Sequence, residues 1–301
     1  MKTLVTGGTG FVGRKLLAKL AEPGVVTRNA SKATATLGET AGQILEWDVA
    51  KRSKALDEGF DYPAVVNLMG ESIADGRWTE DKKKRIRDSR VLGTRNLVDS
   101  LIESDRLPKV FVSTSAVGFY GDPGDDIVTE KHAVGSGFLP EVCQQWEAEA
   151  LKIADHGVRV VLIRVGIVLG EQGGALEKML PLFRWGLGGK LGDGQQWMPW
   201  IHVEDLVNLI VWSINTDDVS GPVNGVAPHP VRNVDFTRGL ASAVGRPAFL
   251  PAPKFGLRLA LGEFAESLFF SQRVVPEKAL TNGFDFQFAD LDSALSDLVP
   301  R

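Results

Sequence analysis

The chain has 301 residues, of which 44% are hydrophobic and 24% charged, and its formal net charge is −4. This balance is ordinary for a globular protein, and the slight negative charge argues against a nucleic-acid binder, which needs a basic field to neutralise phosphates. No stretch approaches the roughly 18 apolar residues of a membrane-spanning helix, so we expect neither a nucleic acid nor a membrane as partner.

The start of the chain turns glycine-rich at once and lacks the apolar segment of a signal peptide. Cys143 is the only cysteine, which excludes an intrachain disulfide, and the four histidines lie far apart without metal-site spacing. The sequence therefore predicts a cytoplasmic, metal-independent protein, monomeric or homodimeric, with one big domain or two modest ones.

Short apolar runs rich in β-branched residues recur before residue 170, and each ends at a polar residue or glycine. Without polar alternation, such runs are typical of strands buried on both faces, as in a parallel sheet. We expect strands at Lys2–Thr6, Val25–Arg28, Ile44–Asp48, Ala64–Leu68, Lys109–Ser113 and Arg159–Val165.

Amphipathic stretches with apolar residues at helical spacing lie between these runs. Helices are predicted at Gly10–Ala21, Thr79–Ser104 and Leu139–His156, and Gly157 is a C-terminal cap signal for the last of these. The alternation of strands and helices implies right-handed crossovers and an α/β fold with a doubly wound parallel sheet. The basic run at 82–85 lies among acidic residues, which is typical of a solvated mixed-charge face.

After Val168, Gly and Trp become dense, and Pro and Phe are frequent beyond Ala227. We interpret this half as a smaller substrate lobe that is interleaved with a cofactor-binding domain. The domain would comprise residues 1–168, and residues 203–227 would rejoin its sheet through a helix at Val203–Ile214 and a strand at Val223–Val226. Residues 169–202 and 228–301 would form the lobe.

A glycine-rich motif, Thr6-Gly7-Gly8-Thr9-Gly10-Phe11-Val12-Gly13, directly follows the first predicted strand. Glycines at this spacing allow a tight turn, the approach of backbone N–H groups to a pyrophosphate, and close packing of the next helix on the strand. The position between a strand and an amphipathic helix favours a dinucleotide-binding loop over a merely flexible turn. The residues predicted at the cofactor are Gly7, Gly10, Phe11, Val12 and Gly13.

The end of the second strand distinguishes NAD sites, which place an acid there, from NADP sites, which tend to carry Arg. Here the strand ends Val26-Thr27-Arg28-Asn29, and Arg28 is 21 residues past Gly7. Because a guanidinium pairs well with phosphate, Thr27 and Arg28 predict NADP(H). The alternative is a solvated surface arginine.

Two further strand ends carry candidate cofactor residues. Asp48 follows the third strand, where it can line an adenine, and Leu68, Met69 and Gly70 follow the fourth. Gly70 permits close backbone approach to the cofactor. Taken alone, either segment is equally compatible with a strand-end turn.

With these residues placed, the chain resembles an extended short-chain dehydrogenase/reductase, and more narrowly the atypical "epimerase family" group that also carries a cell-division-inhibitor-like label. Matching motifs include the glycine loop, Asn67-Leu68-Met69-Gly70-Glu71, Ser113-Thr114-Ser115-Ala116-Val117-Gly118-Phe119-Tyr120-Gly121, Arg164-Val165-Gly166-Ile167-Val168-Leu169-Gly170 and Asn224-Gly225-Val226-Ala227-Pro228. The resemblance implies a Rossmann fold and bound NADP(H), with Arg90, Ser113 and Val165 also at the cofactor, but no particular reaction. Only five residues separate Leu20 from Val26, fewer than the family usually has, so we expect a shortened second strand.

The catalytic pair of the parent superfamily is absent. There, a Lys four residues after a Tyr shares its helix face and lowers the Tyr pKa, and the Tyr exchanges a proton with the substrate. Cys143 and Glu147 take these positions on the helix after Gly137, as they do in the atypical group. A nearby carboxylate raises the pKa of a thiol, so Cys143 is a poor thiolate.

Three interpretations of this helix stay open. Glu147 acts as the general acid or base beside a neutral Cys143, or Tyr120 supplies the proton while Ser115 holds the substrate oxygen, or Cys143 and Trp146 are core residues and nothing catalyses. Ser115 has a simpler alternative of its own, an ordinary hydroxyl that closes the strand end.

On the substrate side, the segments 183–190 and 195–202 bracket a glycine-rich loop. Their cations, amides and indoles suit a planar, anionic or nucleotide-like ligand. The candidate substrate contacts are Arg184, Trp197, Trp200 and His202. Trp197 and Trp200 fit equally well as core anchors between the lobes. Arg232 and Arg273 are further anion candidates, although isolated arginines are more often solvated.

Two classes of function follow. The first is an NADP(H)-dependent oxidoreductase or epimerase-like enzyme acting on a small-molecule carbonyl or hydroxyl substrate, including a nucleotide sugar. The second is a non-catalytic NADP(H)-binding regulatory or scaffold protein. The absent Tyr-x-x-x-Lys pair favours the second class, and the Trp-, Gly- and Arg-rich lobe favours the first, because a sensor has less need of a second pocket.

Overall fold

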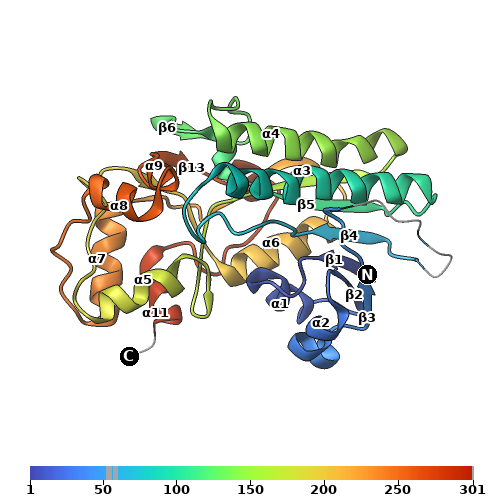
Figure 1. The fold of residues 1–301 in the computed structure, drawn as a ribbon, viewed down its shortest axis with the longest axis horizontal. Coiled ribbons are helices and arrows are strands. Elements are labelled where there is room, and N and C mark those ends of the chain that lie inside the picture. Colours follow the sequence, from blue (N-terminus) through green and yellow to red (C-terminus); the bar gives the residue numbers. More distant parts are fainter. Residues whose placement is uncertain (52–55, 57–59, 300–301) are drawn as a thin grey trace.

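A seven-stranded parallel sheet forms the centre of the molecule, in the order β11-β7-β5-β4-β1-β2-β3 (Figure 1). The structure, a computed structural model, describes residues 1–51, 56 and 60–299. The strands span Thr3–Thr6 (β1), Pro23–Thr27 (β2), Gln43–Glu46 (β3), Ala64–Asn67 (β4), Val110–Ala116 (β5), Arg159–Val165 (β7) and Gly221–Gly225 (β11). The predicted doubly wound α/β fold is confirmed.

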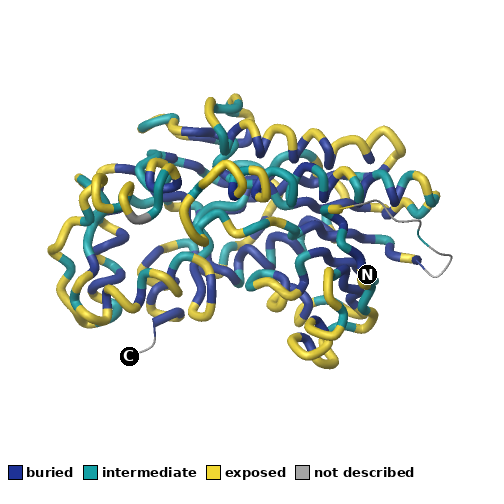
Figure 2. The backbone as a smooth tube through the Cα atoms, viewed as in Figure 1, coloured by how far each residue is buried: buried dark blue, intermediate teal, exposed yellow. Residues whose placement is uncertain are grey.

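Helices cover both faces of this sheet, which explains why its strands lack polar alternation. Helices α1 (Phe11–Leu17), α2 (Ala30–Leu37) and α6 (Val203–Asn215) close one hydrophobic core, and α3 (Glu80–Glu103) and α4 (Phe138–Leu151) close the other. Along β1, Val5 packs into the first core and Leu4 into the second. Figure 2 shows the central strands as buried chain, and β1 and β4 are buried along their whole length, whereas the edge strand β3 is partly exposed.

The strand order reverses at β1, since the chain runs outward from it toward β3 on one side and toward β11 on the other. In open α/β sheets, ligands bind outside the carboxyl ends of the strands at such a point. The ends of β1 and β4 meet there, and the Leu68 N–H donates to the Thr6 carbonyl at 3.2 Å. The fold therefore brings the two predicted cofactor segments together.

Much of the chain after β7 builds a separate core outside the sheet. Trp200 and Phe236 lie at its centre, fully buried. The chain returns to the main sheet at α6 and β11, so the segments of this lobe alternate with segments of the sheet. The remaining α-helices and strands, outside the sheet, are β8 (Ile167–Gly170), α5 (Gly174–Arg184), β9 (Trp197–Met198), β10 (Trp200–His202), β12 (Val231–Arg232), α7 (Asn233–Val244), α8 (Lys254–Leu261), α9 (Phe264–Ser267), α10 (Glu277–Thr281) and α11 (Leu291–Leu298), and β6 (Gly124–Val128) pairs with β13 (Gln272–Val274). Of these, α10 packs through Ala279 into the first core of the sheet.

The connection between α1 and β2 is tighter than the sequence predicts. The helix ends at Leu17 rather than Ala21, and the strand begins at Pro23, two residues early. Glu22 adopts a left-handed backbone conformation, with φ of 51°, which turns the chain back at once. Because β2 keeps five residues and pairs with β1 and β3, the expected shortening of the second strand is not seen.

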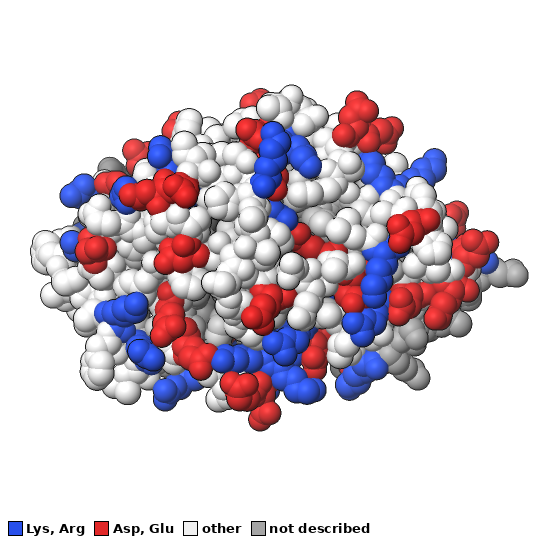
Figure 3. Space-filling view, turned by 90° about the horizontal axis from the view of Figure 1, so that it is seen from above, with Lys and Arg blue, Asp and Glu red and all other residues white. Residues whose placement is uncertain are grey.

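The surface carries both charge signs side by side. In the face shown in Figure 3, acidic and basic side chains are interspersed rather than separated. In the predicted mixed-charge run of α3, Lys83 pairs with Glu80 and Lys84 with Asp88. Among the residues that the structure describes, no helix is both long and apolar enough to cross a bilayer.

Candidate functional site

The glycine loop after β1 contains two positions that accept only glycine and one that does not demand it. Gly7 has φ of +71°, and a Cβ there would lie 2.7 Å from the Leu68 carbonyl oxygen. A Cβ on Gly13 would lie 2.4 Å from the Gly7 carbonyl oxygen, so this glycine allows α1 to pack on the loop. Gly10 has an ordinary backbone, and a Cβ added to it would meet nothing closer than the Gly7 oxygen at 3.2 Å. A Cβ at Gly10 would therefore make a single tight contact, and this position is less restricted than Gly7 or Gly13.

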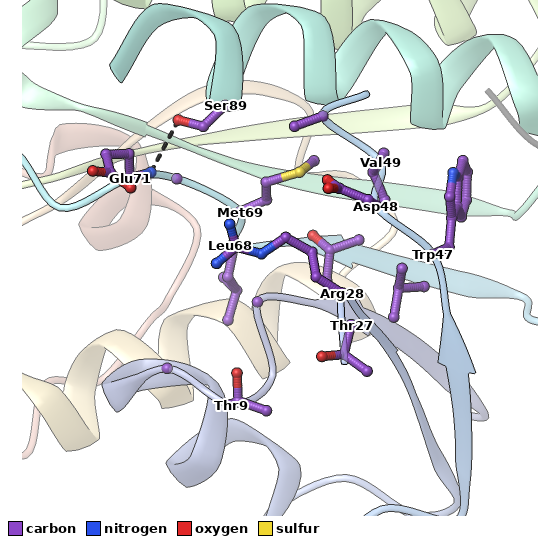
Figure 4. Close-up of a pocket in the computed structure, with 16 residues that line it drawn as sticks. Thr9, Thr27, Arg28, Trp47, Asp48, Val49, Leu68, Met69, Glu71 and Ser89 are labelled. Atoms are coloured by element: carbon purple, nitrogen blue, oxygen red, sulfur yellow. Dashed lines mark hydrogen bonds between the residues drawn. The ribbon is translucent and has the colours of Figure 1, made fainter. Parts of the chain in front are cut away.

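A cavity of about 310 Å³ lies over this loop at the carboxyl ends of β1, β2, β3 and β4 (Figure 4). The predicted cofactor residues that line it are Gly7, Gly10, Thr27, Arg28, Asp48, Leu68, Met69 and Gly70. The other lining residues are Thr6, Thr9, Val26, Trp47, Val49, Ala50, Glu71 and Ser89. The fold thus gathers segments from four strand ends and α3 into one pocket wall.

Arg28 extends from the end of β2 into this cavity, as Figure 4 shows. Within the described part of the chain it has no hydrogen-bond or ion-pair partner, so its guanidinium is available to an anion. Thr27 beside it is occupied locally, because its hydroxyl contacts the backbone of Asn29. These positions fit a phosphate at Arg28.

Several predicted cofactor residues do not line this cavity. The ring of Phe11 packs against the turn between β8 and α5, where a Cβ on Gly170 would lie 2.1 Å from it and one on Gly173 2.4 Å. Arg90 lies behind Gly70 and donates to the Glu71 carbonyl at 3.0 Å. Val12, Gly13, Ser113 and Val165 likewise do not line the cavity.

Asn67, which the motifs did not mark as a site residue, links the cavity to α4. It is fully buried at the end of β4, and its amide accepts from the Thr6 hydroxyl at 2.7 Å and donates to Thr94 and Ser113 at 2.9 and 3.1 Å. The Trp146 indole donates to the same Thr94 hydroxyl at 2.8 Å. This chain of hydrogen bonds fixes α4 relative to the strand ends.

The two residues that replace the Tyr-Lys pair lie beside a buried polar network. The Ser115 hydroxyl donates to Glu147 Oε1 at 2.6 Å, and Arg164 of β7 donates to both carboxylate oxygens at 2.9 and 2.8 Å. Glu147 and Arg164 are only 6% and 5% exposed. Since a buried charge needs a partner, Arg164 is the residue that allows a carboxylate at position 147, and it was missed as a site residue.

Tyr120 belongs to the same network. Its hydroxyl donates to Asn224 Oδ1 at 2.6 Å and accepts from Arg164 at 3.0 Å. Burial raises the pKa of Tyr120 to about 12, although the Arg164 charge opposes the increase. Burial, together with the charge of Glu147, raises the pKa of the Cys143 thiol to about 12 as well. Both groups therefore hold their protons at neutral pH.

These contacts bear on all three interpretations of α4. The carboxylate of Glu147 is engaged by Arg164 and Ser115, Tyr120 is engaged at both its proton and its oxygen, and Cys143 is buried and neutral. Arg164 joins Tyr120 to Glu147, Ser115 donates to Glu147, and Cys143 lies close to Ser115 and Glu147, so the fold brings the four predicted catalytic residues together. Among them, Ser115 is the hydroxyl whose orientation this network fixes at a strand end, as a substrate-binding hydroxyl requires.

Two predicted substrate contacts have packing roles instead. Trp200 is fully buried, and its indole donates to the His229 carbonyl at 3.1 Å. His202 is 1% exposed, accepts from the Glu204 N–H at the start of α6, and stacks on Phe288 at 3.8 Å. Because neither ring has free surface, the core-anchor alternative describes Trp200, and His202 holds the lobe against α6.

The other substrate candidates lie at the surface. Arg184 is exposed at the end of α5. Trp197 is half-buried, with the guanidinium groups of Arg232 and Arg273 at 4.5 and 4.7 Å from its ring, so these arginines are not isolated. Asp125 binds both the Trp197 indole and Arg232, whereas Arg273 has no ion-pair partner in the described ranges.

Comparison with known proteins gives two family matches. A model of the NAD dependent epimerase/dehydratase family matches residues 3–224, and a model of a domain of unknown function, DUF1731, matches residues 252–298. The chain is 40% identical over 311 residues to an epimerase family protein of Arabidopsis thaliana, a chloroplastic SDR39U1 homologue, covering 99% of this chain and 87% of that protein. It is 38% identical to the epimerase family protein ML0860 of Mycobacterium leprae, covering 99% and 95%.

A solved structure extends this likeness to the whole fold. The crystal structure of the human epimerase family protein SDR39U1, isoform 2, with NADPH superposes with a TM-score of 0.88 at 32% identity. The match covers 99% of both chains, so the lobe as well as the sheet has the same arrangement.

Proposed function

The chain belongs to the NAD dependent epimerase/dehydratase family, and we propose that it binds NADP(H) and interconverts a carbonyl and a hydroxyl group on a small, anionic substrate. The observation that carries the proposal is the cavity at the strand ends. The glycine loop lies on one side of it, and on the other lies Arg28, which is unpaired within the described residues. A relative of 32% identity is described with NADPH bound.

The residues around the cavity fit a dinucleotide phosphate. Gly7 and Gly10 line the cavity without a side chain, so they leave space for a phosphate. The loop that carries them leads into the N-terminus of α1, where backbone N–H groups favour an anion. Arg28 would hold the 2′-phosphate, Trp47 and Asp48 would line the adenine, and Gly70 would allow the chain to approach the cofactor closely. The bound cofactor would supply or accept a hydride.

Ser115 would hold the hydroxyl form of the substrate by accepting a hydrogen bond from it, because the proton of Ser115 is already donated to Glu147. Glu147 fixes the Ser115 hydroxyl at 2.6 Å, and Arg164 balances the charge of Glu147, so the three groups form an oriented hydrogen-bonding unit. We infer that this unit takes over the positioning role that Tyr and Lys have in the parent superfamily. A neutral Cys143 would be the nearby proton source, because it holds its proton at neutral pH, whereas Tyr120 would first have to break its hydrogen bond to Asn224.

An anionic, planar group of the substrate would bind at Trp197. Two guanidinium groups flank its ring. The strand that carries Arg273 is tied to the turn that follows β5, because Gln272 donates to the carbonyls of Val117 and Gly121. This arrangement suits a nucleotide-sugar-like molecule. Residues 169–202 and 228–301 would then act as the substrate lobe. The cytoplasmic location and the monomeric or dimeric state stay predictions.

The test is a titration of the purified protein with NADPH and separately with NADH, followed by nicotinamide fluorescence. The NADPH complex is then incubated with a panel of carbonyl compounds that includes nucleotide sugars. Tight NADPH binding with loss of the reduced signal on one compound would support the enzyme. Absence of binding of either dinucleotide would overturn the proposal.

A second candidate function is a non-catalytic NADP(H)-binding sensor or scaffold. The observation in its favour is the engagement of Glu147 by Arg164 and Ser115, whose three hydrogen bonds stabilise the charged carboxylate and so oppose its role as a proton donor. Tight NADPH binding without turnover on any compound of the panel would support this alternative.

A further inference from the structure

Glu46 is an acid beside the proposed phosphate site that the sequence motifs do not mark. It ends β3, and its partner in the parallel register is Thr27, so the two side chains project from the same face of the sheet. Glu46 Oε2 accepts a hydrogen bond from the Ala30 N–H at 2.7 Å. Ala30 is only two residues beyond Arg28, which places this carboxylate next to the segment that would bind a phosphate.

We propose that Glu46 weakens the binding of the phosphorylated dinucleotide and so sets how strongly the protein prefers NADPH over NADH. The inference rests on the proposed function, because it concerns the affinity of the same cavity. It makes Glu46 a specificity-determining residue that acts against Arg28.

Charge balance around the cavity favours this role. Asp48, an acid on the cavity wall, has a cation beside it, since Lys51 lies 3.1 Å from its carboxylate. Glu46 has no ion-pair partner within residues 1–51, 56 and 60–299. Among these residues its negative charge is therefore not balanced by a paired cation, and it acts on whatever Arg28 binds.

The backbone N–H groups near Arg28 also indicate that Glu46 opposes phosphate binding. The Lys32 N–H is taken by the Asn29 side chain and the Ala30 N–H by Glu46, so the first turn of α2 is already supplied with acceptors from the chain. A 2′-phosphate at Arg28 would have to compete with the Glu46 carboxylate or tolerate its repulsion. NADH lacks this phosphate, so its binding involves neither the competition with Glu46 nor the repulsion by it.

The test is the variant Glu46→Gln, which removes the charge but keeps an oxygen that can accept from Ala30. We expect its Kd for NADPH at pH 8 and low salt to fall about 3- to 10-fold, the size expected for a partly screened charge pair, while the Kd for NADH changes less than about two-fold. The effect shrinks as salt is raised, because exposed charges are screened within about 10 Å at 0.1 M.

The matched control is Glu39→Gln, an exposed acid at the turn after α2 that changes the net charge equally. An unchanged or weaker NADPH affinity in Glu46→Gln, or an equal gain in Glu39→Gln, would overturn the inference. If Glu46→Gln failed to fold, Glu46→Ser would carry the same test. Failure of the wild-type protein to bind NADPH would instead contradict the proposed function, so the two failures are distinguishable.

Discussion

Arg164 donates to Glu147 through two hydrogen bonds of 2.9 and 2.8 Å, and both side chains are buried. Glu147 lies on the face of α4 that points at Ser115, at the position where the resemblance places the lysine of the parent superfamily. A carboxylate is therefore kept at this position by a guanidinium from the neighbouring strand, and the site is organised around that pair.

The first prediction concerns the stability of this pair. Arg164→Met should lower the free energy of unfolding by about 3–5 kcal/mol, because it leaves the Glu147 charge buried and unpaired. The double variant Arg164→Met/Glu147→Leu should recover part of the loss, as urea unfolding of the four proteins would show. Strictly additive losses would mean that the two side chains do not depend on each other.

The second prediction concerns Arg28. Arg28→Glu should weaken NADPH binding by far more than NADH binding, because it replaces the cation facing the 2′-phosphate with an anion. Fluorescence titration with both dinucleotides measures the two affinities. Equal losses for NADPH and NADH would rule out the 2′-phosphate assignment.

The third prediction separates fold from binding within the glycine loop. Gly13→Ala should destabilise the protein, since its Cβ would overlap the Gly7 carbonyl and the Gly8 backbone. Gly10→Ala should change the melting temperature little and weaken NADPH binding, because the added methyl group enters the cavity rather than the core. Thermal unfolding and titration of both variants test this contrast, which fails if Gly10→Ala binds NADPH as wild type does.

The fourth prediction is a loss of stability at alkaline pH. Cys143 and Tyr120 have pKa values raised from 9.0 and 10.0 to about 12. The unfolded chain releases these protons before the folded protein does, so their contribution is complete below about pH 9 and disappears as pH rises toward 12. Urea unfolding between pH 8 and 11 should show the decline, and Cys143→Ala should make it shallower. An unchanged slope would contradict the burial of the thiol.

The fifth prediction concerns the cofactor affinity of α4 variants. Cys143→Ala and Glu147→Gln should leave the Kd for NADPH nearly unchanged, because neither side chain lines the cavity. The titration is run below the melting temperature of each variant, with Arg28→Glu as the positive control. A large loss would assign these residues to the cofactor site.

The sheet and its cofactor side were predictable from the sequence because their signals are local. Apolar runs located the strands of the sheet, and the loop from Gly7 to Gly13 requires glycine for reasons that its spacing already shows. Arg28 could be placed because the second strand ends directly before it. The left-handed conformation of Glu22 had no such signal, since glycine would have been the expected residue there.

For the network around α4, the sequence predicted the individual residues but not the contacts between them. Ser115, Tyr120, Cys143 and Glu147 could be found one by one, but Arg164, which joins Tyr120 to Glu147, lies on β7, and its pairing depends on the sheet order. Asn67 and Asn224 could not be predicted for the same reason. Each is an ordinary residue at a strand end in the sequence, and its hydrogen bonds depend on which other segments pack beside it. For Trp200 and His202, the residue types suggested a ligand site, but both side chains are buried in the structure.

The contact between Phe11 and the turn at Gly170 and Gly173 limits how this protein can vary. A side chain at either glycine would overlap the ring, so a larger residue in the turn requires a smaller one at position 11. Position 11 belongs to the sheet half of the molecule, and positions 170 and 173 lie in the turn that it contacts. We therefore expect these three positions to co-vary among homologues. A chimaera that takes the sheet from one homologue and the lobe from another should fold well only if it inherits both sides of this contact.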